Sequence, residues 1–332
     1  MATLRIRIEN FKSINNFSAY LSRINILIGK PDSGKSNILE GLFLAGIPHI
    51  AKEINKLKLP NELLQDYLKS LIAHNIRFKS YLDLFHSWET NKKIIINIGE
   101  LLIEYILKEE ELQLKNMQLS DIEHIGVLKN SLPIRFYHER NLKLEKSYSE
   151  YIPSYLQENG KNFDNVAMKY ENLKVKLQTI LENYNLQQYI KEKYDIIHPR
   201  TGNSLWPELI ADGLKRFIYF YVAIASNDFY AQQYGEKPII LLEEPELKMY
   251  PDLINELMEI ILKSKNYFVI STHNPFLLSF LINSNKIKKE ELKIFGVKKE
   301  QNETKVYEIS LEKAGEKLMD ADEIIKEWEE LV

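Results

Sequence analysis

The chain has 332 residues, 45% of them hydrophobic, which is enough to bury a large core in one elaborate domain or in two lobes. Its 44 basic and 47 acidic residues give a formal net charge of -3, which excludes a global attraction to nucleic acid or to an anionic membrane. The absence of cysteine excludes disulfides, thiolate catalysis and cysteine-based metal sites. The start of the chain lacks the apolar core of a secretory signal, and the longest apolar run, Phe217 to Ala225, is too short to span a bilayer, so we expect a cytoplasmic protein.

The first part of the chain alternates short apolar runs with turn residues. These runs predict strands over 4–8, 17–21, 24–28, 92–98 and 132–138. Helical spacing of the apolar residues predicts helices between 50 and 90 and over 100–114. The following stretch, 141–200, is mainly helical and polar in pattern, and we interpret it as an inserted helical lobe.

The last part of the chain alternates helices with strands. The predicted elements are a helix over 207–226, a strand over 238–242, a helix over 251–264, a strand over 267–271, a further helix, and a hairpin formed by 292–299 and 304–310. Because strands that alternate with helices pair in parallel, this order predicts a parallel sheet covered on both faces. The predicted fold class is therefore α/β.

Residues 28–37 read IGKPDSGKSN and fit the pattern G-x-x-x-x-G-K-[ST] of a phosphate-binding loop. The glycines let the backbone direct several N–H groups at one anion, and a helix beginning at Gly34 adds its positive end. Lys35 is placed to reach the β- and γ-phosphates of a nucleotide, and the Ser36 hydroxyl to hold Mg²⁺. The residues expected to bind the nucleotide are Gly29, Lys30, Pro31, Asp32, Ser33, Gly34, Lys35, Ser36 and Asn37. The apolar run before the loop and the helical spacing after it favour this interpretation over a glycine turn before an ordinary helix.

A second group of polar residues follows the predicted strand over 238–242. Glu243 and Glu244 lie at the carboxyl end of this apolar strand, where ligands bind in open α/β sheets. We assign Glu243 to the metal, and Glu244 to the polarisation of the water that attacks the γ-phosphate. His273 follows the next strand, and its imidazole could sense the γ-phosphate. Beside a phosphate-binding loop we prefer these roles to the alternatives, a solvated acidic turn and an ordinary turn histidine.

Taken in order, these motifs resemble the ABC-type ATPase heads, and specifically the AAA-family ATPases similar to the OLD and SMC heads. The resemblance rests on IENFKSI at the first strands, GKPDSGKSN as Walker A, ADGLKRF as the signature, LLEEPE as Walker B and STHNP as the switch histidine. It implies a P-loop NTPase with a mostly parallel central sheet, an antiparallel β lobe and an inserted helical lobe. The implied division is one domain with parts at 1–140, 141–205 and 206–332.

The resemblance also implies that two chains pack head to tail with ATP and Mg²⁺ between them, so that the signature of one chain completes the site of the other. Gly213 then faces the phosphates from the start of an apolar helix; a buried helix with a glycine near its start is the alternative. In the family, the residues that match Phe11 and Lys12 lie near the nucleotide base, and Glu139 occupies the place of the loop that links the two lobes.

The chain departs from the family pattern at several positions. The signature serine falls on Ala211, the metal-side acid is Glu243 rather than aspartate, and the asparagine often found inside Walker A is Pro31. The His-rich turn common after Walker B reads LKMYP. Lost contacts from the opposing chain lower turnover without abolishing binding, so we expect ATP binding with slow hydrolysis.

Three functions compete on the sequence. The first is an ATP-dependent dimerisation switch with slow hydrolysis, coupled to a partner protein or to DNA. The second is the head of an OLD-type nuclease, for which the 59 residues after His273 (274–332) are too few, while Asp320 to Glu323 is better explained as a capping box. The third is a module that uses ATP to hold DNA without hydrolysis, but the basic stretches 135–146 and 286–299 interleave acidic residues and are typical of a solvated surface.

Overall fold

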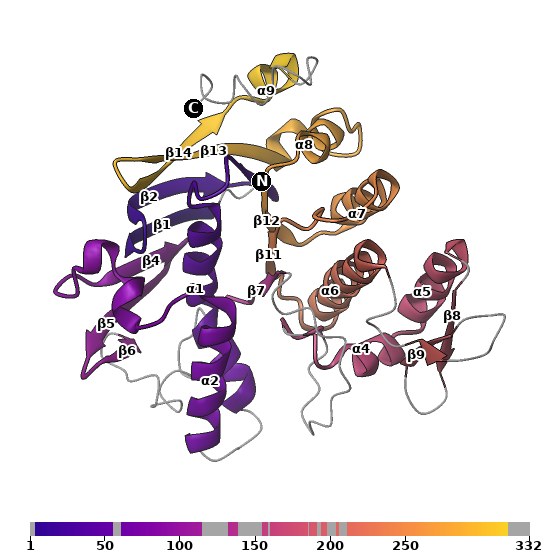
Figure 1. Cartoon of the computed structure of the whole chain (residues 1–332), viewed down its shortest axis with the longest axis horizontal. Coiled ribbons are helices and arrows are strands. Elements are labelled where there is room, and N and C mark those ends of the chain that lie inside the picture. The colour runs from indigo at the N-terminus through magenta and orange to yellow at the C-terminus, as the bar shows by residue number, and fades with distance from the viewer. Residues whose placement is uncertain are drawn as a thin grey trace. The chain divides into compact units, whose positions relative to one another are not determined.

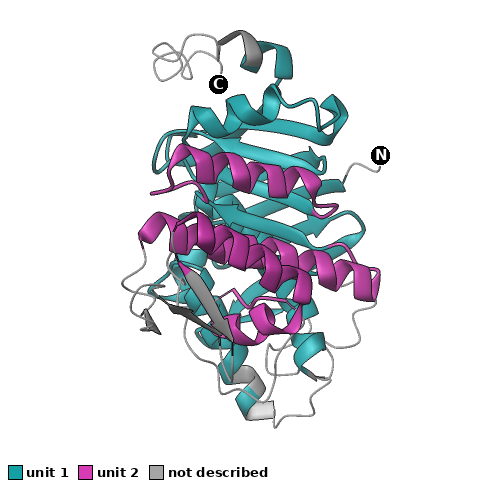
Figure 2. Ribbon diagram, turned by 90° about the vertical axis from the view of Figure 1, so that its right-hand side faces the viewer, with its two compact units in different colours: residues 1–136, 238–244, 267–332 teal, residues 137–237, 245–266 magenta. Residues whose placement is uncertain are grey.

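The computed structural model describes residues 4–55, 61–114, 132–138, 155–158, 160–184, 186–190, 194–197, 204–205 and 211–317. The chain divides into two compact units (Figure 2). Unit 1 comprises residues 1–136, 238–244 and 267–332, and unit 2 comprises residues 137–237 and 245–266. The three parts expected at 1–140, 141–205 and 206–332 stay a prediction. Within the described ranges, no helix combines the length and the apolar character needed to cross a membrane.

Unit 1 contains a six-stranded sheet in the order β14-β13-β3-β12-β11-β7 (Figure 1). Its strands are β3 (Ile24–Ile28), β7 (Ile134–Tyr137), β11 (Ile239–Glu243), β12 (Tyr267–Thr272), β13 (Leu292–Glu300) and β14 (Glu303–Ile309). The four neighbours β13, β3, β12 and β11 run parallel, and β14 is the antiparallel partner of β13. This arrangement confirms the mostly parallel central sheet and the hairpin predicted near the C-terminus.

A second sheet of unit 1 has five antiparallel strands in the order β2-β1-β4-β5-β6. The strands are β1 (Leu4–Phe11), β2 (Ile14–Leu21), β4 (Ile94–Ile98), β5 (Leu101–Lys108) and β6 (Glu111–Leu114). The sheet confirms the antiparallel β lobe. The helix predicted over 100–114 is wrong, because this segment forms the β5–β6 hairpin.

Two features explain why this segment forms a hairpin. Buried Leu101, Ile103 and Tyr105 alternate along β5 with less buried neighbours, and β5 is paired on both sides, with β4 and with β6. Glu109 and Glu110 have positive φ angles of 51° and 64°, as both central residues of a tight hairpin turn require. Sheet pairing therefore decides a segment whose apolar residues also satisfy helical spacing.

The helix α1 (Lys35–Asn55) is the next element after β3 and contacts strands of both sheets. Its apolar face, with Ile38, Leu39, Leu42 and Phe43 at most 1% exposed, anchors the start of the helix in the core of unit 1. The other helices of unit 1 are α2 (Asn61–Asn75), the 3-10 helices η1 (Tyr81–Leu84), η2 (His86–Trp88) and η5 (Lys289–Glu291), and α8 (Pro275–Ile282) and α9 (Leu311–Lys317). The helical prediction between 50 and 90 thus holds for α1 and α2, and beyond residue 80 only as two short 3-10 turns.

Unit 2 contains the helices α4 (Phe163–Lys169), α5 (Glu171–Asn183), α6 (Asp212–Tyr234) and α7 (Pro251–Lys263). It also contains a three-stranded antiparallel sheet of β8 (Gln187–Ile190), β9 (Tyr194–Ile197) and β10 (Ser204–Leu205). The inserted helical lobe is confirmed by α4 and α5, whereas β8 and β9 correct the helical prediction for the end of 141–200. The helix predicted over 207–226 begins at Asp212 and continues to Tyr234.

Candidate functional site

Three parallel strands of unit 1 bring the predicted polar residues to one edge of the sheet. The register pairs Ile28 of β3 with Thr272 of β12, and Glu243 of β11 with Ser271 of β12. Because the strands run in the same direction, the segments that follow them emerge side by side. The edge therefore gathers the loop after β3, Glu243 and Glu244 at the end of β11, and His273 after β12.

The phosphate-binding loop, defined here as residues 29–36, runs from the end of β3 into the first turn of α1. Lys35 is buried, and its Nζ donates hydrogen bonds to the carbonyl oxygens of Gly29, at 2.7 Å, and of Lys30, at 2.8 Å. The ammonium group thus lies across the loop, at the end of α1 where free backbone N–H groups and the helix dipole favour an anion. The strand, loop and helix occur in the order that the sequence predicts.

Two glycines of this loop leave space for strands of the C-terminal hairpin. A Cβ on Gly29 would lie 2.1 Å from the carbonyl oxygen of Val297, and one on Gly34 would lie 1.9 Å from Oγ1 of Thr304. Gly34 also has a φ of +103°, a conformation that side chains rarely allow. The loop can therefore keep its shape beside β13 and β14 only with glycine at both positions.

A hydroxyl network joins the loop to two other segments. Asn37 Nδ2 donates to Ser13 Oγ at 2.6 Å, and Ser13 Oγ lies 2.6 Å from Oγ1 of Thr304. The backbone N–H of Thr304 donates to the carbonyl oxygen of Ser13 at 2.7 Å. The first turn of α1, the β1–β2 turn and the start of β14 thus form one hydrogen-bonded group. Neither Ser13 nor Thr304 is predicted as a site residue from the sequence, because Ser13 lies within IENFKSI without a role assigned to it and Thr304 lies in none of the motifs.

The two glutamates differ in their surroundings. Glu243 ends β11 and is partly buried. Glu244 has a φ of 43°, and its N–H donates to the carbonyl oxygen of Ser271 at 2.9 Å. Its Oε1 lies 3.1 Å from His273 Nδ1, and the two side chains are 30% and 45% exposed. Because an ionised carboxylate can only accept, the imidazole donates this bond through Nδ1–H, which leaves Nε2 for another partner.

Phe11 is the last residue of β1 and is buried, and Lys12 is the first residue of the turn that follows and is partly buried. Phe11 is 0% exposed within the core of unit 1, so its ring supports the turn and offers no open face. Lys12 has a φ of 50°, forms an ion pair with buried Glu40 of α1, and donates through Nζ to the carbonyl oxygen of Arg77 at 2.6 Å. Proximity of these two residues to a nucleotide base stays a prediction.

The predicted signature lies in unit 2, at the start of α6. Gly213 has a packing role there, because a Cβ would lie 2.5 Å from the carbonyl oxygen of Lys248. Asp212 forms ion pairs with Lys215, at 3.2 Å, and with Lys248, at 3.6 Å. The hydrogen bond from Lys215 and the charges of both lysines lower the pKa of the Asp212 carboxyl. Glu139 and the acidic run 320–323 lie outside the described residues.

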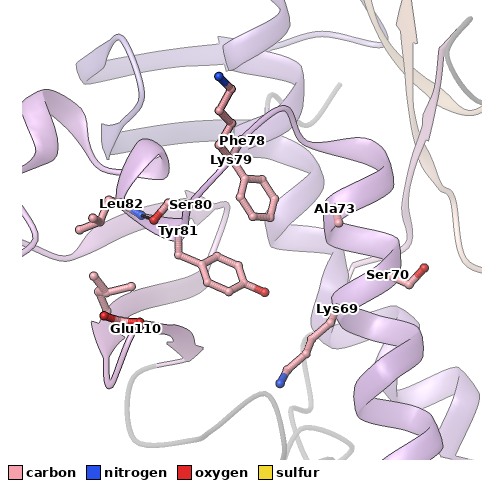
Figure 3. Close-up of a pocket in the computed structure, with 10 residues that line it drawn as sticks. Lys69, Ser70, Ala73, Phe78, Lys79, Ser80, Tyr81, Leu82 and Glu110 are labelled. Carbon is pink, nitrogen blue, oxygen red and sulfur yellow. Dashed lines mark hydrogen bonds between the residues drawn. The ribbon is translucent and has the colours of Figure 1, made fainter.

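A cavity of about 730 Å³ in unit 1 is built from α2, residues 78–82 and the β5–β6 hairpin (Figure 3). The rings of Phe78 and Tyr81 stack in its wall with centroids 5.1 Å apart, and burial raises the pKa of Tyr81. None of its lining residues belongs to the phosphate-binding loop or to the β11 and β12 ends. The cavity is therefore separate from the strand-end site.

The donor set at the strand ends fits Mg²⁺. The Ser36 hydroxyl and the Glu243 carboxylate are oxygen ligands of the kind that this hard cation prefers. No group of three or more histidine, cysteine, aspartate or glutamate side chains suited to a metal ion occurs among the described residues. Mg²⁺ at a nucleotide does not require one, since one or two protein ligands are complemented by phosphate oxygens and water.

The chain is similar to a family model over part of its length and to solved structures over most of it. Residues 123–279 match the family model described as "AAA domain, putative AbiEii toxin, Type IV TA system". Among solved structures, an SMC head bound to the C-winged helix domain of ScpA is similar, with a TM-score of 0.53, 16% identity, and coverage of 95% of this chain and 100% of that chain. No curated protein sequence matches the chain.

A second solved structure has the same fold. It is the Smc head domain with an extended coiled coil bound to the C-terminal domain of ScpA from Pyrococcus furiosus, with a TM-score of 0.52, 15% identity, and coverage of 96% of this chain and 99% of that chain. The chain has the fold of an ABC-type ATPase head. The range that matches the AAA-domain family model, 123–279, contains the ends of β11 and β12, with Glu243, Glu244 and His273, whereas the phosphate-binding loop precedes it.

Proposed function

We propose that this ATPase head binds ATP with Mg²⁺ at the phosphate-binding loop, hydrolyses the ATP slowly, and pairs head to tail with a second copy in response. The observation that carries the proposal is the meeting of three groups at one sheet edge: the loop with Lys35, the glutamates after β11, and the Glu244–His273 hydrogen bond of 3.1 Å. A nucleoside triphosphate needs a cation at its phosphates, and the attacking water needs a proton acceptor. The lysine and the glutamates supply these groups.

Each side chain has a separate role in this proposal. The Lys35 ammonium leaves the loop carbonyls and binds the β- and γ-phosphates. Ser36 and Glu243 hold Mg²⁺, which supplies charge neutralisation at the phosphates when it is bound. Glu244 accepts a proton from the attacking water and orients it, and His273 fixes the Glu244 carboxylate through Nδ1.

Slow hydrolysis follows from the openness of the site in one chain. Glu244 and His273 are both partly exposed, so water reaches the γ-phosphate face without restriction. A second chain would exclude this water and add donors to the γ-phosphate. Ala211 lacks the hydroxyl that the family pattern places in the signature, so the second chain would supply fewer donors.

A partner protein is better supported than DNA as the molecule that binds this head. Both similar SMC heads are described in complex with a domain of ScpA, and we extend from them only that a partner protein reads the state of this head. Direct DNA binding is less well supported, because partly exposed lysines of the β13–β14 hairpin have acidic partners: Lys293 with Glu308, Lys298 with Glu300 and Lys305 with Glu303.

The proposal is tested by measuring mass in solution and phosphate release. Without nucleotide we expect a particle of 39.1 kDa, and with ATP and Mg²⁺ a particle of twice that mass. Phosphate release should rise more steeply than in proportion to protein concentration, because only dimers hydrolyse. A chain that hydrolyses ATP at a rate per molecule independent of concentration, and stays monomeric, would contradict the shared site.

A further inference from the structure

The β13–β14 hairpin is seated directly on the phosphate-binding loop. Val297 of β13 and Thr304 of β14 approach the loop so closely that Gly29 and Gly34 cannot carry a Cβ. Oγ1 of Thr304 also lies 3.4 Å from the carbonyl oxygen of Ser33. The hairpin thus touches the loop at its beginning and at its end.

Between these two contacts, the loop carries an acidic residue in an unusual conformation. Asp32 has a φ of 61°, in the left-handed region that favours glycine and tolerates aspartate. Its side chain is 87% exposed, and its Oδ2 lies 3.0 Å from Nζ of Lys299 on β13. The same hairpin that closes on both ends of the loop therefore also holds its middle.

The ion pair between Asp32 and Lys299 changes the charge that an anion meets at the loop. A phosphate-binding loop attracts anions through its backbone N–H groups, and a carboxylate on the same loop opposes a ligand that carries several negative charges. The Lys299 ammonium offsets that charge. Exposed ion pairs contribute little to the free energy of folding. We therefore expect this pair to affect mainly the affinity of the loop for an anion.

We propose that Lys299 is a positioning residue of the nucleotide site, which holds Asp32 in the left-handed conformation and cancels its charge toward the triphosphate. The inference rests on the proposed nucleotide binding and adds a residue to it that no sequence motif marks. Lys299 acts through Asp32, so its contribution should disappear when Asp32 loses its charge.

A double-mutant cycle tests this dependence. ATP and inorganic tripolyphosphate are titrated calorimetrically into the wild-type chain, Lys299→Met, Asp32→Asn and the double variant. We expect Lys299→Met to weaken binding of both ligands by about fivefold to tenfold, from one uncompensated charge near the phosphates. The double variant should bind within about twofold of Asp32→Asn. Added salt should reduce the defect of Lys299→Met, because screening weakens the repulsion.

A matched control is Lys293→Met. Lys293 lies on the same strand, pairs with Glu308, and is six residues or roughly 20 Å from Lys299 along β13. It should bind both ligands as the wild type does, and the thermal unfolding of all variants should be unchanged. Wild-type affinity in Lys299→Met, or an undiminished defect in the double variant, would overturn the role of Lys299 while leaving nucleotide binding intact. Absence of ATP binding to the wild-type chain would overturn both.

Discussion

Gly34 in unit 1 and Gly213 in unit 2 both belong to motifs that are expected to face phosphate, but their surroundings differ. Around Gly34 lie the Lys35 ammonium and the hydroxyl network of Ser13 and Thr304. Around Gly213 lies the backbone of Lys248, which fills the space that a Cβ would occupy. A motif glycine alone therefore does not identify a ligand site. The polar groups beside it also have to suit the ligand: hydroxyls and an ammonium lie near Gly34, whereas the charged groups near Gly213 pair with one another.

The largest effect is expected from Lys35→Ala. The variant removes the ammonium that bridges two loop carbonyls, and it should weaken ATP binding at least about a hundredfold, or roughly 3 kcal/mol. Lys52→Ala, in the last turn of the same helix α1, is the matched control and should bind ATP normally. Equal affinity in Lys35→Ala and wild type would remove the basis for a nucleotide site in unit 1.

Substitutions of Glu243 and Glu244 should affect different steps. Glu244→Gln should slow hydrolysis at least about a hundredfold while Mg²⁺ and ATP stay bound, because the amide cannot accept the proton of the attacking water. Glu243→Gln should instead raise the Mg²⁺ concentration needed for activity. Phosphate release measured across a Mg²⁺ titration distinguishes the two. If Glu243→Gln stops turnover at saturating Mg²⁺ and Glu244→Gln does not, the roles are reversed.

Unit 2 contains a partly buried carboxyl group, that of Asp228, whose pKa is raised. Burial raises the pKa of Asp228 to about 6, against a smaller lowering by the hydrogen bond from Ser264 Oγ at 2.6 Å. Asn266 Nδ2 donates to the same carboxyl oxygen at 2.8 Å. The folded state therefore prefers protonated Asp228. The raised pKa therefore contributes to the free energy of unfolding in full below the unfolded pKa of about 3.9. This contribution is lost as pH rises through about 6.

Asp228→Asn keeps an oxygen that accepts both hydrogen bonds and removes the titration. Compared with wild type, its free energy of unfolding should be higher by about 2 kcal/mol at pH 8 and nearly equal at pH 4. Chemical denaturation at the two pH values measures this difference. Asp212→Asn is the control: its pKa is lowered, so the variant should lose a little stability at pH 8. A gain in Asp228→Asn that is the same at both pH values would contradict the burial effect.

The smallest expected effect concerns the start of α6. Ala211→Ser restores the hydroxyl of the family signature at an exposed position, and it should raise ATP turnover about fivefold if this helix end faces the nucleotide of a second chain. Ala211→Asp caps the helix equally well but adds a negative charge. It should therefore stabilise α6 without raising turnover. Identical turnover in wild type and both variants would indicate that the start of α6 serves packing alone.

The central sheet could be predicted because its strands carry strong local signals. The apolar runs before Gly29 and Glu243 are bounded by turn residues, and their order along the chain requires parallel pairing. The segment 100–114 could not be assigned in the same way, because its apolar residues satisfy both periods. Only pairing with β4, and a turn of two glutamates with positive φ, make it a hairpin.

The site could be predicted in part for a related reason. Lys35, Glu243, Glu244 and His273 stand in recognisable motifs at strand ends. The contact between Ser13 and Thr304 could not be predicted, since it joins residues 291 positions apart and depends on how the hairpin meets the loop. The burial of Phe11 is likewise a property of the folded core.

The most direct test of a nucleotide site in unit 1 is calorimetric titration of the wild-type chain with ATP and Mg²⁺. The account predicts saturable binding of one ATP per chain, competition by ADP, and much weaker binding of adenosine, because most of the affinity comes from phosphate contacts with the loop. No binding at millimolar ATP, or equal affinity for ATP and adenosine, would contradict it.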